Sequence, residues 1–474
     1  MDIDFTGHPL FAGSPFNRPT RFEAEVFDCE VEGRIPSDMN GSFYRLQCDF
    51  AYRPPDKEWL TGFNGDGHLS LFRFREGHVD YRSRYIRTDR LMAERAARKR
   101  LFGVYRNRLT DDPSVAHVDR GAANTHVFWH GGKLMVLKED SHPYLVDPHS
   151  LETLGRWDFD GRLTAASFSA HPKIDPLTGE MIGYAYQAKG DLSDDIAVYI
   201  IDPSGRIVRE VWLKSPYLGV IHDIALTRNH VVIPVIPLVA SRARLEAGEP
   251  MWDWSPDHPT MVGVLPRDGE ARDVRWFRGP PRMTFHFLNA VERDGRIDME
   301  LPVSDTPGSP SRIMRWSFDL NRPDDGFGET AVAAGNSPLA RMDDRYISRP
   351  YRYGFVGHAD TARPHGAALD PAMRGRISNT WQRFDLASGE VSSFYVGDHQ
   401  GLQECCFVPR GADAPEGDGY LIGVASNYAD MSSDLVIVDA QRLEEGAVAT
   451  VKLPFRLRSG THGAWMPASE IPTA

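Results

Sequence analysis

The stretch Leu71-Phe-Arg-Phe-Arg-Glu-Gly-His-Val-Asp-Tyr81 reads as two short strands joined by a tight turn. Apolar and charged residues alternate on both sides of Gly77, which is the pattern of strands with one buried face. Glycine adopts the positive φ that a two-residue hairpin turn needs. The stretch His126-Val-Phe-Trp-His-Gly-Gly-Lys-Leu-Met-Val136 has the same form. Both stretches therefore predict antiparallel hairpins.

A short motif recurs where such strands end. An apolar residue is followed by Asp and then by a turn, at Val146–Ser150, Ile174–Gly179, Ile201–Gly205, Phe318–Leu320 and Phe384–Gly389. Asp and Ser hydrogen-bond to nearby backbone groups in such turns, and glycine supplies the positive φ. Repeated strands and turns with few helical stretches favour an all-β propeller over a sandwich.

Helical spacing of apolar residues is clearest in Arg90-Leu-Met-Ala-Glu-Arg-Ala-Ala-Arg-Lys-Arg100, which predicts a helix. A linker rich in Pro, Gly or Ser would mark a domain boundary, and we find none in the 474 residues. We therefore expect residues 1–474 to form a single domain.

Composition excludes several classes of protein. Charged residues make up 25% of the chain and hydrophobic residues 41%, which is ordinary for a globular protein. The net charge of −12 argues against nucleic-acid binding, which needs clustered Lys and Arg. We interpret the basic run Arg95–Arg100 as the solvated face of the predicted helix. The four cysteines show no spacing typical of a zinc site or a disulfide framework.

No stretch approaches the 18 or so apolar residues of a membrane span. The N-terminal residues also lack the basic and apolar regions of a secretory signal. We therefore expect a cytoplasmic protein without stable membrane insertion.

Four of the 17 histidines lie in separate contexts, which are Phe168–Asp175, Val220–Asp223, Thr284–Phe287 and Gly460–Gly463. Other matching stretches are Phe63-Asn-Gly-Asp-Gly67, Leu101-Phe-Gly-Val-Tyr-Arg-Asn107 and Lys138-Glu-Asp140. Through these motifs the chain resembles the carotenoid cleavage oxygenases from Pro19 to Trp465, and in particular their lignostilbene dioxygenase and isoeugenol monooxygenase branch. The number and order of the matches make the resemblance specific.

The resemblance implies a seven-bladed β-propeller with a helical and loop-built dome over one face. It also implies Fe(II) held by four neutral imidazoles, those of His171, His222, His286 and His462. Acidic partners are expected to orient such rings. The matching positions are Glu139 behind His222 and Glu404 behind His462, while Thr125 matches a threonine beside an open coordination position.

The chain departs from the family pattern at two places. A third glutamate, expected in a Glu-Phe-Pro-Arg context, is replaced in the stretch Pro338-Leu-Ala-Arg341. We therefore expect no carboxylate behind His286. After Pro302 the chain passes through the short stretch Val303–Ser311, where relatives carry a longer loop, so we expect a wider or more open cavity.

Three further positions match residues that recognise a 4-hydroxyphenyl ring in the stilbene-cleaving branch, namely Phe63, Tyr105 and Lys138. A Lys amine and a Tyr hydroxyl can both hydrogen-bond a phenol oxygen and favour its phenolate. Phenolate charge spreads into a conjugated C=C bond and makes it electron-rich. The resemblance therefore implies a dioxygenase that cleaves the central C=C of 4-hydroxystilbenes with O2 into two aromatic aldehydes, with Tyr105 and Lys138 as catalytic residues and Phe63 as a packing surface.

Two alternatives remain open at this point. The first keeps the chemistry but uses a 4-hydroxyphenylpropene such as isoeugenol. The second is a propeller that serves as a binding scaffold after loss of its iron, a reading favoured only by the missing third glutamate. An apocarotenoid substrate suits a polar phenol site poorly. The expected partners are a small aromatic alkene and O2, and a homodimer is also open.

Overall fold

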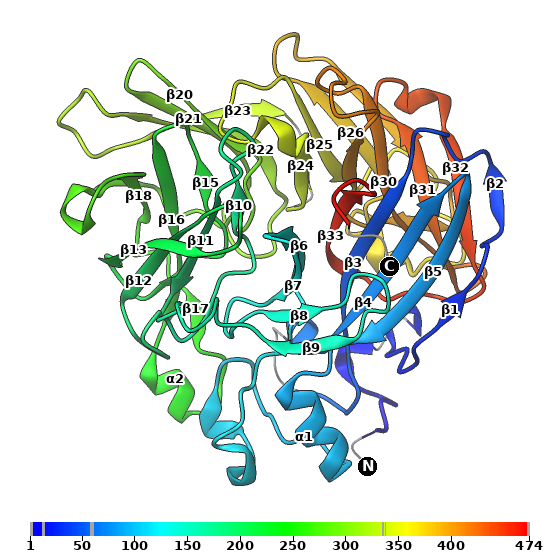
Figure 1. The fold of residues 1–474 in the computed structure, drawn as a ribbon, viewed down its shortest axis with the longest axis horizontal. Helices are drawn as coiled ribbons and strands as arrows, with labels where there is room; N and C mark the ends of the chain where they lie inside the picture. The colour runs from blue at the N-terminus through cyan, green and yellow to red at the C-terminus, as the bar shows by residue number, and fades with distance from the viewer. Residues whose placement is uncertain (1–2, 12–14, 57–60, 334–335, 337, 472–474) are drawn as a thin grey trace.

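Seven antiparallel sheets form a ring around a central axis in the computed structural model, which describes residues 3–11, 15–56, 61–333, 336 and 338–471 (Figure 1). We number the sheets as blades in chain order. The predicted seven-bladed β-propeller is confirmed.

The first three blades hold the N-terminal part of the chain and its last strand. Blade 1 has the order β1 (Glu25–Val26), β5 (His78–Tyr85), β4 (Asp66–Arg75), β3 (Gly41–Asp49) and β33 (Gly460–Pro467). Blade 2 consists of β6 (His126–His130), β7 (Lys133–Leu137), β8 (Tyr144–Val146) and β9 (Thr153–Arg156). Blade 3 consists of β10 (Lys173–Ile174), β11 (Met181–Tyr186), β12 (Asp195–Ile201) and β13 (Ile207–Lys214).

The next two blades continue around the ring. Blade 4 contains β14 (Gly219–Val220), β15 (Ala225–Leu226), β16 (His230–Ala240), β17 (Trp252–Trp254), β18 (Thr260–Pro266) and β19 (Arg275–Gly279). Blade 5 contains β20 (Asn289–Arg293), β21 (Arg296–Val303), β22 (Arg312–Asp319) and β23 (Gly328–Ala333).

The last two blades complete it. Blade 6 contains β24 (Ala340–Met342), β25 (Tyr353–His358), β26 (Thr380–Asp385) and β27 (Val391–Tyr395). Blade 7 contains β28 (Gln400–Leu402), β29 (Cys406–Pro409), β30 (Gly419–Asn427), β31 (Ser432–Asp439), β32 (Ala447–Leu453) and β2 (Val31–Gly33).

Both predicted hairpins are present. In the first, Arg75 of β4 pairs with His78 of β5, and the two turn residues Glu76 and Gly77 have φ of 54° and 82°. In the second, β6 and β7 are joined by Gly131 and Gly132, with φ of 56° and 72°. Two consecutive positive φ values are typical of a type I′ turn, whose twist matches that of the flanking strands.

The recurring Asp residues all accept a hydrogen bond from the backbone N–H two residues further on. The donors to Asp147, Asp175, Asp202, Asp319 and Asp385 are His149, Leu177, Ser204, Asn321 and Ala387, at 2.9–3.0 Å. Four of these turns join the third and fourth strands of a blade, in blades 2, 3, 5 and 6. The sequence motif therefore marks a turn that is repeated around the propeller.

The predicted helix over 90–100 is shorter in the structure, where α1 covers Asp89–Ala97. The Thr88 side chain accepts from Leu91 N at the start, and Arg98 adopts a left-handed conformation with φ of 52° that ends the helix. A second short helix, α2, covers Arg242–Glu246. Among the described residues, no helix combines the length and the apolar character needed to cross a lipid bilayer.

Both helices lie at the same side of the ring, at the bottom of Figure 1. The segment 98–125 lies there too, and its Asn107 Nδ2 donates to the carbonyls of Leu245 and Glu249 at 3.0 and 2.8 Å. These helical and loop elements lie outside the seven sheets, and the dome over one face that the resemblance implies stays a prediction. They bring Tyr105, which lies in the same segment, close to blades 2 and 3.

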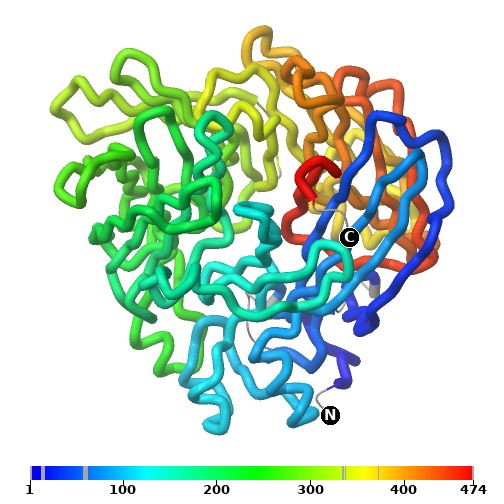
Figure 2. The backbone as a smooth tube through the Cα atoms, viewed as in Figure 1, coloured from blue at the N-terminus to red at the C-terminus, as the bar shows by residue number. Residues whose placement is uncertain are grey.

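The two ends of the chain close the ring by exchanging strands. The C-terminal strand β33 pairs with β3 in blade 1, while the N-terminal strand β2 pairs with β32 in blade 7. Figure 2 shows the blue N-terminal strands beside the red C-terminal segment. Separation of blades 1 and 7 would therefore break two antiparallel ladders.

A buried guanidinium lies at this closure. Arg45 of β3 is 3% exposed and donates from Nε to Gln403 Oε1 at 3.0 Å. The same oxygen accepts the backbone N–H of Gly460, the first residue of β33, at 2.8 Å. Gln403 of blade 7 therefore holds both strands of the closing pair.

Gln403→Leu should destabilise the propeller, because it leaves donors of Arg45 and Gly460 buried without that acceptor. Hydrogen bonds to a charged group contribute about 1.5–3 kcal/mol each, so we expect a loss of roughly 2–3 kcal/mol in the free energy of unfolding. Urea unfolding followed by tryptophan fluorescence measures this. The exposed Gln441→Leu is the matched control, and an equal unfolding midpoint for both variants would contradict the assignment.

Candidate metal centre

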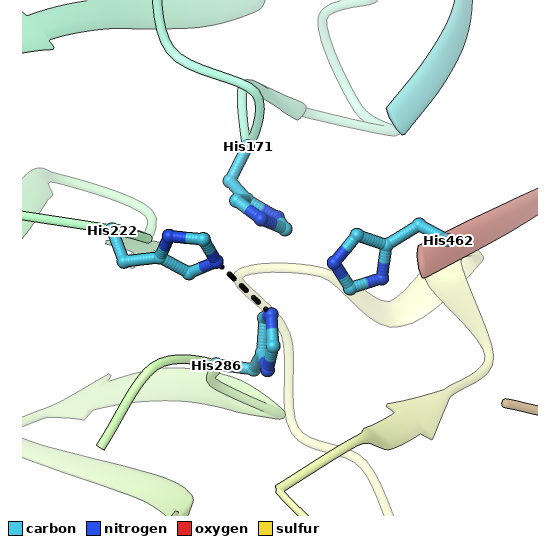
Figure 3. A group of neighbouring side chains, drawn as sticks. All are labelled: His171, His222, His286 and His462. Carbon is cyan, nitrogen blue, oxygen red and sulfur yellow. Dashed lines mark hydrogen bonds between the residues drawn. The ribbon is translucent and has the colours of Figure 1, made fainter. Parts of the chain in front are cut away.

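The four histidines of the sequence motifs come together at the axis of the propeller. His171 lies just before β10, His222 lies between β14 and β15, and His286 lies just before β20. His462 belongs to β33. Figure 3 shows the four rings facing one central point. Blades 3, 4, 5 and 1 each contribute one ring, which explains how residues so distant in sequence can meet.

Their spacing suits a single metal ion. One ligand nitrogen from each ring can be chosen so that all four lie within 4.8 Å of one another. The Nε2 atoms of His222 and His286 are 3.2 Å apart. A transition metal binds imidazole nitrogen at about 2.0–2.1 Å, which keeps ligand nitrogens roughly 3–4 Å apart. The ring nitrogens of the cluster are therefore almost as close together as the ligands of one bound metal ion.

A β-bulge directs His462 to the axis. In the β3–β33 ladder, Arg45 pairs with Gly463 and Gln47 pairs with Gly460, so Thr461 and His462 together face one residue of β3. Such bulges change the direction of a side chain. Steric crowding explains why glycine flanks the bulge on both sides. A Cβ on Gly460 would lie 2.6 Å from Arg45 Nε, and one on Gly463 would lie 2.7 Å from the Phe43 ring.

Three rings have an oxygen behind them. His222 Nδ1 is 2.8 Å from Glu139 Oε2, and His462 Nδ1 is 2.9 Å from Glu404 Oε1. His286 Nδ1 is 3.0 Å from the backbone carbonyl of Pro338, in the stretch where the family glutamate is replaced. Two of the rings thus face a carboxylate and the third faces a neutral oxygen.

These partners determine which ring nitrogens are available. A carbonyl only accepts, so Nδ1 of His286 carries the proton and its Nε2 presents a lone pair. The carboxylate of Glu139 assigns the same tautomer to His222. In neutral rings the 3.2 Å contact between these Nε2 atoms therefore has no proton to share, and a cation between them would relieve the repulsion. His171 Nε2 is also buried without a hydrogen-bond partner. The donor set fits a metal ion.

The electrostatics favour neutral rings for His171 and His286 and ionised carboxylates for Glu139 and Glu404. Burial, followed by the charges of the neighbouring histidines, lowers the pKa of His171 and of His286 well below 6.5. Burial would raise the pKa of Glu139, but the adjacent His222, Arg106 and Lys138 lower it to about 2. Neutral imidazoles keep their lone pairs available, and a nearby carboxylate compensates the charge of a bound cation.

The residues predicted to bind a phenol lie beside Glu139. The Tyr105 hydroxyl donates to Glu139 Oε1 at 3.2 Å, and Lys138 Nζ lies 4.6 Å from the centre of the Tyr105 ring. Lys138 Nζ also donates to the Phe63 carbonyl at 3.0 Å. The Phe63 side chain itself is 52% exposed, so its predicted role as a packing surface stays a prediction.

Thr125 lies immediately before β6, the inner strand of blade 2, and its hydroxyl donates to Asn124 Oδ1 at 3.0 Å. The next residue, His126, is a fifth histidine that the sequence analysis did not single out. Its ring centre is 4.7 Å from that of His462 and 5.4 Å from that of His171. Thr125 is therefore close to the cluster, and its predicted place beside an open coordination position stays a prediction.

A cavity of about 60 Å³ lies on the axis against the cluster, lined by His171, His286 and His462. Charged residues of four blades complete its wall, namely Lys173, Asp223, Arg341, Asp344 and Glu404. That volume holds a few water molecules.

Sequence reasoning missed other residues at the site. Tyr186 of β11 donates to Glu139 Oε1 at 2.8 Å, and no sequence signal distinguished it from a core tyrosine. Asp223 directly follows a predicted ligand, so its place in the sequence was the only available signal. The stretch Val303–Ser311 lies at the same end of blade 5 as His286, because Met283 and Ser304 exchange backbone hydrogen bonds at 2.9 and 2.8 Å.

Comparison with known proteins agrees with this geometry. The family model described as retinal pigment epithelial membrane protein matches residues 17–467. Isoeugenol monooxygenase of Pseudomonas putida is 43% identical, with 96% of this chain and 98% of the relative aligned. Lignostilbene-α,β-dioxygenase isozyme III of Sphingomonas paucimobilis is 40% identical, with 96% and 97% aligned.

A crystal structure of Pseudomonas brassicacearum lignostilbene dioxygenase superimposes with a TM-score of 0.92 at 39% identity, covering 98% of this chain and all of that one. These likenesses extend over nearly the whole chain, and the resemblance stated from the sequence motifs is confirmed. The chain belongs to the carotenoid cleavage oxygenase family.

Proposed function

We propose that this protein is an Fe(II)-dependent oxygenase that cleaves the central C=C bond of 4-hydroxystilbenes, such as lignostilbene or resveratrol, with O2. One alkene and one O2 give two aromatic aldehydes, so all atoms are retained. One observation carries this proposal. A single carboxylate, that of Glu139, contacts both a histidine of the metal centre and the tyrosine predicted to bind the phenol.

The contacts of Glu139 connect the two halves of the site. Its Oε2 accepts from His222, and its Oε1 accepts from Tyr105 and Tyr186. A phenol that contacts Tyr105 therefore lies one carboxylate away from the metal ligands. This short separation between the phenol-binding residues and the metal ligands suits an alkene whose reacting bond is conjugated to the phenol ring, as in a stilbene.

The protein's own residues would bind and polarise the phenol. Burial, then the charge of Glu139, raises the pKa of Tyr105 well above 10, so at neutral pH Tyr105 is an uncharged hydroxyl group and not a base. Lys138 is 3% exposed, so its interaction with a phenol oxygen takes place away from bulk water. Charge-assisted hydrogen bonds are strong in such surroundings. Together these groups would favour the phenolate, which enriches the conjugated C=C bond.

Iron is the metal that the family and the donor set support best. All-imidazole ligation suits several divalent transition metals, iron among them. When bound by His171, His222, His286 and His462, iron would supply the activation of O2. The residues around it would position the alkene, hold the ligand rings and limit the access of water.

Isoeugenol-type alkenes are the second candidate, and the identity of 43% to isoeugenol monooxygenase favours it. The Tyr105 and Lys138 pair suits either phenol. The short stretch Val303–Ser311 at the His286 end of blade 5 does not distinguish the two alkenes.

Substrates distinguish these candidates. With Fe(II)-loaded protein, we expect a 4-hydroxystilbene to lose its stilbene absorbance and yield two aldehydes, while its 4-methoxy analogue stays intact because it cannot form a phenolate. Chromatography identifies the aldehydes. Cleavage of isoeugenol alone would replace the stilbene proposal by its alternative, and no cleavage of either phenol by iron-loaded protein would reject both.

The proposed role of the four histidines as metal ligands predicts how much iron the protein binds. Anaerobic loading should give about one Fe(II) per chain, and His171→Ala should weaken binding by more than the roughly 10- to 100-fold typical of losing a residue that only orients a ligand. Competition with a chromophoric chelator measures the affinity. The exposed His117→Ala serves as control. Absence of iron from the unmodified protein would favour the scaffold alternative instead.

Lys138→Met should lower kcat/KM for the 4-hydroxystilbene by about 10²–10³-fold, which is typical of removing one buried donor that stabilises developing charge. Tyr105→Phe should act in the same direction. Lys189→Met, at an exposed lysine that pairs with the buried Asp195, is the control and should leave kcat/KM unchanged. Steady-state kinetics with equal iron content checks this. Full activity of iron-loaded Lys138→Met would exclude a role for Lys138 in catalysis.

A further inference from the structure

Asp223 is a buried carboxylate in the wall of the axial cavity, and neither the metal cluster nor the phenol site explains it. It is 2% exposed and lies directly after His222. Its Oδ1 accepts the backbone N–H of Ile224 at 2.8 Å and is 2.7 Å from Lys173 Nζ. Its Oδ2 accepts the backbone N–H of Phe287 at 3.1 Å. One side chain therefore contacts three separate segments.

Each of these segments carries a histidine of the metal centre. Lys173 follows His171 by two residues, at the start of blade 3. Phe287 directly follows His286, at the entrance to blade 5. Asp223 itself follows His222 in blade 4, between the other two. The carboxylate is thus placed to fix three ligand segments relative to one another.

Such a connection is needed because the ligands belong to different sheets. Hydrogen-bonded ladders set the positions within one blade, whereas the segments of His171, His222 and His286 belong to three different sheets. Glu139 extends from blade 2 to His222, and Glu404 from blade 7 to His462. Asp223 contacts both the His171 segment, through Lys173, and the His286 segment, through Phe287.

His286 has particular need of this support. The oxygen behind its ring is the Pro338 carbonyl, a neutral acceptor two residues before β24, whereas the rings of His222 and His462 face carboxylates. The N–H of the adjacent Phe287 is instead held by the charged oxygen of Asp223. Hydrogen bonds to a carboxylate are roughly twice as strong as those between neutral groups.

We propose that Asp223, with Lys173 as its charge partner, is a positioning residue that holds the segments of His171, His222 and His286 at the separation required by one metal ion. The proposal rests on the metal role of the four histidines. Loss of Asp223 would leave each histidine in place along the chain but would loosen the distances between them.

Co(II) binding tests this directly, because the visible spectrum of Co(II) reports the geometry of its ligands without any turnover. We expect Asp223→Ala to weaken Co(II) affinity by about 10- to 100-fold, as is typical for residues that orient metal ligands, and to change the spectrum of the loaded protein. Asp223→Asn, which keeps an acceptor oxygen but no charge, should weaken binding by less than Asp223→Ala does. Lys173→Met, which removes only the charge partner, should change the spectrum of the loaded protein.

Asp175→Asn is the matched control. Asp175, in blade 3, is another buried carboxylate and pairs with Arg267 of blade 4. Among the described residues, its hydrogen-bond and ion-pair partners include no residue of a segment that carries a ligand histidine of another blade. It should lower the urea unfolding midpoint of the metal-free protein while leaving Co(II) affinity and the spectrum unchanged. This separates an effect on the metal centre from a general loss of stability.

The outcomes distinguish the two proposals. If the unmodified protein binds Co(II) and the folded Asp223→Asn and Lys173→Met variants match it in affinity and spectrum, the role of Asp223 is wrong and the metal centre stands. If the unmodified protein binds neither Co(II) nor Fe(II), the metal role of the four histidines fails, and the role of Asp223 fails with it. Should Asp223→Ala not fold, the other two variants decide the matter.

Discussion

Pairing between β33 and β3 is the interaction on which the rest of the molecule depends. It joins the last strand to the first blade, and it contains the bulge that turns His462 toward the axis. Arg45 and Gln403 hold the same junction from inside, with Gln403 next to the carboxylate behind His462. Closure of the ring and completion of the metal centre are therefore one event: His462 reaches the other three histidines only in the closed ring.

The charge distribution around the cluster is uneven, and the local chain explains why. Carboxylates stand behind His222 and His462, whereas Pro338 offers His286 only a carbonyl. A dipole stabilises a positively polarised ring less than a full negative charge does. The His286 side of the centre is therefore more weakly compensated than the His222 and His462 sides. It is also the side where Asp223 places a charge one residue from the ligand.

The sequence predicted the parts of the fold that depend on local chemistry. Hairpin turns at Gly77 and Gly131 and the turns after Asp147 or Asp385 follow from positive φ and from short-range hydrogen bonds, so periodicity and turn residues suffice to find them. The helix ends earlier than predicted because Arg98 adopts a left-handed conformation that no pattern of apolar residues reveals. The number of blades and the choice of histidines came from resemblance, since both depend on contacts between distant segments. The places of Tyr186 and His126 beside the site were not predicted, for the same reason.

The residues proposed to bind the phenol and the four clustered histidines come from different parts of the chain. Tyr105 belongs to the segment 98–125, whereas the histidines belong to the inner ends of the blades. Tyr105 and the rest of that segment lie outside the seven sheets, whereas Ser304 of the stretch Val303–Ser311 exchanges backbone hydrogen bonds with Met283, three residues before His286. Glu139 links the two groups of residues, since its two oxygens connect His222 and Tyr105. A change at Tyr105 would therefore also alter the hydrogen bonding of Glu139, the partner of His222.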